Sequence, residues 1–60
     1  PYRNQEMLQD LLSVLQGTTR LAVAWDLTTP SEQVIVRPVS QWKKMELPDI
    51  KKKPAIFLFQ

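Results

Sequence analysis

The chain has 60 residues with no histidine and no cysteine, and it carries a formal net charge of +2. The absence of these two residue types excludes disulfides, thiolate nucleophiles and sites built on imidazole bases or ligands. A core of this size rarely contributes more than roughly 3–5 kcal/mol. We therefore expect one small domain over residues 1–60 that needs regular packing, oligomerisation or attachment to a larger body. Because the chain begins at Pro1 rather than Met, we expect a module of a longer chain.

The N-terminal segment is predicted to form a helix over residues 4–16. Its four leucines follow the spacing of one helical face, and they are Leu8, Leu11, Leu12 and Leu15. We expect Asn4 to cap the first turn with its side chain. Gly17, the single glycine, stands where a left-handed residue commonly ends a helix.

Two strands are predicted next. Large and small side chains alternate over residues 21–27, which indicates a strand with one large apolar face and one face of small side chains. Residues 28–31 have the composition of a turn, and the β-branched residues 34–36 are predicted to return as the second strand of a hairpin. Pro38 cannot donate a backbone hydrogen bond, so this strand is expected at a sheet edge or to end there.

The C-terminal third is predicted to contain a helical turn or loop at 40–45 and a strand at 55–59. This last strand is apolar on both faces, which is typical of a strand buried on both sides or covered by another chain. The fold class that follows is α+β, with an N-terminal amphipathic helix packed on a small antiparallel sheet of two to three strands, in the chain order α-β-β-β.

Catalytic patterns are weak in this sequence. No serine has a histidine that could act as its base. A catalytic Ser–Lys pair is not excluded, because Lys43 and Lys44 lie close to Ser40 in the sequence. Asp26 and Glu32 flank one turn and form a candidate carboxylate pair, and acid–base work would require that pair to sit in a cleft. With one glycine, the chain cannot form a phosphate-binding loop. We expect a non-enzymatic protein without a cofactor or a metal.

The leading functional hypothesis is a protein–protein interaction or oligomerisation module. Three apolar strands and one helix leave more apolar surface than a chain of this length covers, and such surface marks interaction sites. Four aromatic residues are the predicted partner-binding anchors: Trp25, Trp42, Phe57 and Phe59.

The alternative hypothesis is nucleic-acid binding by the basic C-terminal part. Residues 1–36 carry two basic and four acidic side chains, whereas residues 37–60 carry six basic and two acidic ones. Lysines release counterions from phosphates, and a tryptophan stacks on an exposed base. The candidate residues are Arg37, Trp42, Lys43, Lys44, Lys51, Lys52 and Lys53. The competing explanation is that these lysines only keep the apolar strand 55–59 from aggregating.

Membrane insertion is not expected. The longest apolar runs, 21–25 and 55–59, are far shorter than the ~20 residues that a membrane helix needs. No signal-peptide pattern is present, and the absence of cysteine is compatible with a reducing compartment, so an intracellular location is favoured but not established by the sequence.

Overall fold

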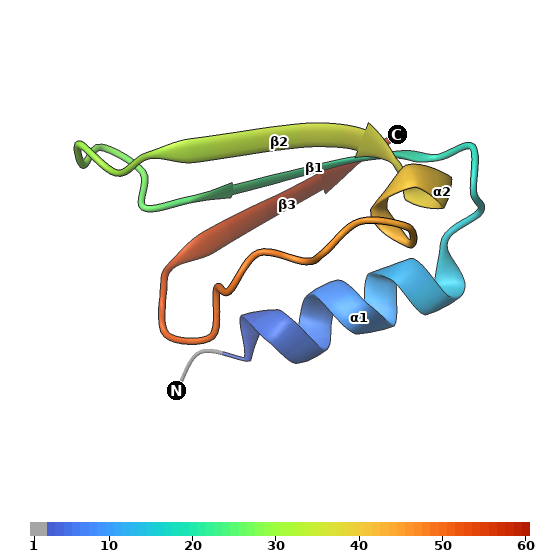
Figure 1. Ribbon diagram of the computed structural model, residues 1–60, viewed down its shortest axis with the longest axis horizontal. Helices are drawn as coiled ribbons and strands as arrows, with labels where there is room; N and C mark the ends of the chain where they lie inside the picture. Colours follow the sequence, from blue (N-terminus) through green and yellow to red (C-terminus); the bar gives the residue numbers. More distant parts are fainter. Residues whose placement is uncertain (1–2) are drawn as a thin grey trace.

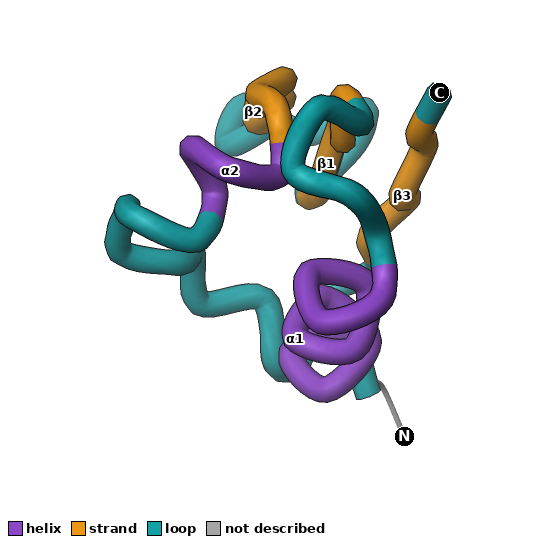
Figure 2. Tube along the Cα trace, turned by 90° about the vertical axis from the view of Figure 1, so that its right-hand side faces the viewer, coloured by secondary structure: helices purple, strands orange, loops and turns teal. Residues whose placement is uncertain are grey.

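A three-stranded antiparallel sheet forms one layer of the computed structural model, which describes residues 3–60 (Figure 1). The central strand β1 (Arg20–Trp25) pairs with β2 (Gln33–Pro38) on one side and β3 (Ala55–Phe59) on the other. The helix α1 (Asn4–Val14), the short helix α2 (Val39–Trp42) and the segment 43–54 form the second layer (Figure 2). The predicted α+β fold is confirmed, and the sheet has three strands.

The apolar face of α1 packs on the sheet as its leucine spacing predicts. Leu8 and Leu12 are buried, and Leu11 and Leu15 are partly buried against the same core. The helix ends at Val14, two residues earlier than predicted, because Leu15 adopts an extended backbone.

Both predicted helix caps are wrong. Asn4 lies inside the first turn of α1, and its side-chain amide instead donates to the carbonyl oxygens of Ile50 and Lys53. Gly17 does not have a positive φ, and its carbonyl accepts a hydrogen bond from the Ser40 amide at 3.0 Å. In both cases a contact distant in sequence replaces the local cap.

The two faces of β1 differ as the alternating pattern predicts. Leu21, Val23 and Trp25 point into the core, whereas Ala22 and Ala24 point to the opposite face. The strand ends at Trp25 rather than at residue 27, since the chain turns at Asp26 with a φ of 55°.

The second strand, β2, is longer than the predicted 34–36 and lies at the sheet edge that Pro38 suggested. The segment 40–45, predicted as a helical turn or a loop, begins inside the helical turn α2. This helix starts one residue earlier, at Val39, and ends at Trp42.

The core lies between the sheet and the helical layer. Its buried members are Leu8, Leu12, Leu21, Val23, Trp25, Val39, Trp42 and Ile50. Trp42 has 0% exposure, and its indole N–H donates to the Leu21 carbonyl at 2.9 Å. The one polar atom of this large side chain is therefore satisfied inside the core.

Candidate interaction surface

The sheet face opposite α1, here called the outer face, is formed by Ala22, Ala24, Val34, Val36, Ile56 and Leu58. Among the described residues, no element covers this face (Figures 1 and 2). Its four large side chains are 41–67% exposed. An antiparallel sheet with one solvated face normally carries polar residues there. The outer face instead carries an apolar surface across all three strands.

A shallow trough runs along the outer face above the central strand. Ala22 lies between Val36 and Leu58, and Ala24 lies between Val34 and Ile56. The small alanines form the floor, and the larger side chains form the walls. The hollow over Ala22 has a volume of about 370 Å³.

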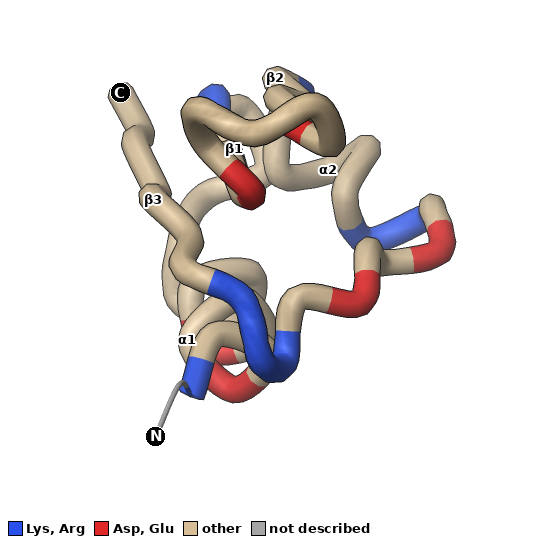
Figure 3. The backbone as a smooth tube through the Cα atoms, turned by 90° about the vertical axis from the view of Figure 1, so that its left-hand side faces the viewer, with Lys and Arg blue, Asp and Glu red and all other residues tan. Residues whose placement is uncertain are grey.

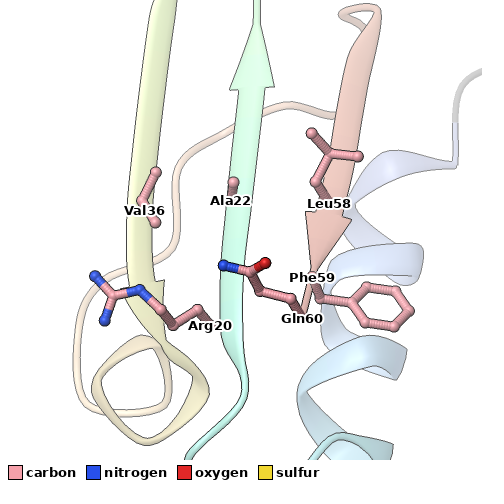
Figure 4. A pocket seen from close by; sticks show the side chains of 6 residues that line it. All are labelled: Arg20, Ala22, Val36, Leu58, Phe59 and Gln60. Carbon is pink, nitrogen blue, oxygen red and sulfur yellow. The ribbon is translucent and has the colours of Figure 1, made fainter.

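Polar side chains close one end of this trough. Arg20 and Gln60 lie beside each other at the end of the sheet, below the apolar rows (Figure 4). Phe59 also borders this end, but its ring points away from the trough, past the edge of β3 that faces away from β1 (Figure 4). The trough is thus apolar along its length and polar at one end.

The four predicted aromatic anchors have different environments. Trp25 and Trp42 are core residues, with exposures of 8% and 0%. Phe57 is partly buried against the core, whereas Phe59 is 54% exposed. Of the four, only Phe59 is more than half exposed, whereas the two indoles fill the space between the layers.

Trp42 cannot serve as a stacking platform for a nucleic acid in this fold, because its ring is buried. The basic residues are also dispersed. Figure 3 shows the lysines that follow α2 well apart from those that precede β3, with acidic residues between the two groups. Lys53 is paired with Asp26 at 3.3 Å, and the Arg37 guanidinium donates to the Val36 carbonyl at 2.7 Å. The seven candidate residues do not form one basic surface.

The two carboxylates suggested for acid–base chemistry have separate partners. Asp26 forms the ion pair with Lys53, and Glu32 accepts a hydrogen bond from the Thr28 amide at 2.9 Å. Neither contact joins the two carboxylates to each other.

A second ion pair lies on the exposed side of α1. The hydrogen bond from Arg3 to the Glu6 carboxylate, aided by their charge attraction, lowers the pKa of Glu6 and raises the pKa of Arg3. Both side chains are exposed, so water screens the pair and it adds little to stability.

Within residues 3–60, no group of three or more acidic side chains is placed to hold a metal ion. No helix in the same range has the length and apolar character needed to span a bilayer. No protein-family model matches the chain, and no curated protein sequence matches it.

The outer-face residues were not among the predicted site residues. Their signal was present in three separate places: the small residues of 21–27, the β-branched residues of 34–36 and the two apolar faces of 55–59. Only the strand register shows that these residues form one surface.

Proposed function

We propose that this chain is a non-enzymatic protein-interaction module that associates through its outer face. The observation that carries the proposal is the uncovered apolar surface formed by all three strands. Large exposed apolar patches mark sites of association. A second layer packed about 10 Å above a sheet is the usual way to bury such a face.

The shape of the outer face favours self-association. Ile56 and Leu58 form a ridge along one side, and Ala22 and Ala24 form the floor of the trough. When two copies pack face to face, the ridge of one copy fits the trough of the other. This arrangement also gives a 60-residue chain the additional core that its size demands.

Sedimentation velocity over a wide range of concentration tests the proposal. We expect the wild-type chain to show a mass above the 7.0 kDa of one chain, and Val36→Lys to restore the single-chain mass. Val36 is exposed on the outer face, so a lysine there leaves the core intact. Gln33→Lys is the matched control, because it adds the same charge to the same strand on the opposite face.

A wild-type chain that sediments as one copy at every concentration contradicts self-association through this face. Equal effects of the two lysine substitutions contradict it as well, since a change of net charge would then explain the result.

A further inference from the structure

The outward edge of β3 carries free backbone hydrogen-bonding groups. Arg20 and Gln60 exchange both of their backbone hydrogen bonds, at 3.2 and 3.1 Å. Because hydrogen-bonded pairs alternate along an antiparallel ladder, every second residue of β3 bonds to β1. The N–H and C=O groups of Ala55, Phe57 and Phe59 therefore point to the open edge, and no hydrogen bond among residues 3–60 uses them.

The opposite edge of the sheet is protected. By the same alternation, the backbone groups of Val34, Val36 and Pro38 face outward from β2. Pro38 has no N–H, and the Arg37 guanidinium already occupies the Val36 carbonyl at 2.7 Å. Proline and charged side chains are the usual devices that prevent a strand from being added to an edge. β3 contains neither, since its residues are all apolar.

The helix α1 lies beneath β3 rather than beneath the centre of the sheet (Figures 2 and 4). A strand added beside β3 would therefore lie above this helix, whose exposed apolar side chains include Met7 at 50% exposure. If two copies paired their β3 edges around a two-fold axis, both α1 helices would lie on the same face of the joined sheet. Each helix would then occupy the space beneath the two paired β3 strands. This overlap disfavours a second copy as the occupant of the edge.

Unpaired positive charge lies at the N-terminal end of β3. The segment Lys51–Lys53 is separated from the strand by Pro54 alone and lies beside the first turn of α1 (Figure 3). Lys53 is paired with Asp26, whereas Lys51 and Lys52 are exposed and have no ion pair among residues 3–60. The C-terminal end of an antiparallel partner strand would meet these two lysines.

We propose that the open edge of β3 binds an extended segment of another protein, which adds to the sheet as an antiparallel fourth strand. The segment is apolar where it contacts β3 and α1, and acidic residues follow it where Lys51 and Lys52 lie. Main-chain hydrogen bonds supply the affinity in this mode of recognition, and side-chain contacts supply the specificity. The proposal does not require the outer face, so the two surfaces are testable apart.

Fluorescence anisotropy with synthetic peptides tests the strand addition. The probe is a labelled peptide of alternating valine and threonine that ends in two glutamates. Two further peptides carry N-methyl groups, one on the valine amides and one on the threonine amides. Only one set of amides faces β3, so we expect one methylated peptide to lose binding and the other to keep it. If both N-methylated peptides bind, or if neither binds, the proposal is overturned.

Variants of the protein test the edge itself. Phe59→Pro and Phe59→Ala both remove the ring, but only the proline removes an N–H that points outward. We expect Phe59→Pro to bind the peptide at least tenfold more weakly than Phe59→Ala, with circular dichroism confirming that both remain folded. Equal affinities of the two variants contradict strand addition at this edge.

The acidic end of the probe tests the charge contribution. We expect the double change of Lys51 and Lys52 to Glu to weaken binding by up to about fivefold for each lysine. The same change at Lys43 and Lys44 is the matched control, because those residues lie away from β3 (Figure 3). Equal effects of the two double variants overturn the predicted orientation.

Two outcomes separate this proposal from the outer-face proposal. Val36→Lys should leave peptide binding unchanged, because Val36 lies on β2, across the sheet from the open edge of β3. A wild-type dimer that Phe59→Pro dissociates and Val36→Lys does not would show that a second copy occupies the edge, and would overturn the partner assigned here.

Discussion

At the residue scale, Trp42 shows how burial changes the role of a side chain. Its position between Gln41 and two lysines suggests an exposed aromatic in a basic segment. In the fold it is the largest fully buried side chain, and its N–H is paired with the Leu21 carbonyl. Trp42 therefore stabilises the core and is not a contact for a partner.

The substitution Trp42→Ala is expected to unfold the chain. Loss of a buried tryptophan costs roughly 3–5 kcal/mol, which is comparable with the entire stability expected for a domain of this size. Trp42→Phe keeps most of the apolar volume but removes the hydrogen bond from the indole N–H to the Leu21 carbonyl, at a cost of about 0.5–1.5 kcal/mol. Urea denaturation followed by circular dichroism measures both changes. A cooperative transition for Trp42→Ala close to that of the wild type would contradict this role.

At the element scale, the connection from α1 to β1 is shaped by its contact with α2. Gly17 accepts a hydrogen bond from Ser40 at the start of α2, and its φ is in the ordinary negative range. The neighbouring Thr19 carbonyl accepts from Val39 at 2.8 Å. The backbone of Gly17 thus contributes to a contact between two segments and not to a left-handed turn.

The substitution Gly17→Ala is expected to stabilise the protein by about 0.4–1 kcal/mol, because alanine restricts the unfolded chain more than glycine does. The added Cβ would lie 3.4 Å from the Ser40 Cβ, which the site accommodates with little movement. Thermal denaturation measures the change. A clear loss of stability would show that residue 17 needs the conformational freedom of glycine, as the sequence pattern had suggested.

At the scale of the whole molecule, α1 holds the long connection to β3 in place. Gln5 donates to the Pro48 carbonyl at 3.0 Å and accepts from the Ile50 amide at 3.1 Å. Asn4 contacts the carbonyls of Ile50 and Lys53 in the same region. These contacts order a segment that has no regular secondary structure of its own and that leads into the exposed strand β3.

The substitution Gln5→Ala is expected to cost roughly 1–3 kcal/mol, because it leaves the Pro48 carbonyl and the Ile50 amide without their partner. Hydrogen exchange should show a loss of protection at the Ile50 amide that exceeds the loss at β1. Gln9→Ala is the control, since Gln9 is an exposed residue one turn further along the same helix. Similar exchange in both variants would argue against a role for Gln5 in holding the connection.

The sequence predicted most of the elements, because each has its own periodic signal. The leucine spacing of α1, the alternation in β1 and the apolar run of β3 are local patterns, and local patterns determine which face of an element is buried. Element ends were predicted less well. Helix α1 ends two residues early and β1 stops at Asp26, because backbone conformation at the ends depends on the segments that they meet.

The candidate surfaces could not be predicted in this way. The sequence by itself determined that apolar surface would exceed what one helix covers, because that follows from counting apolar residues and strands. Only the tertiary structure decided which residues remain uncovered. The central position of β1 places Ala22 and Ala24 between two rows of larger side chains and leaves the edge of β3 open. Strand order and register are set by contacts between distant residues, so no local pattern contains them.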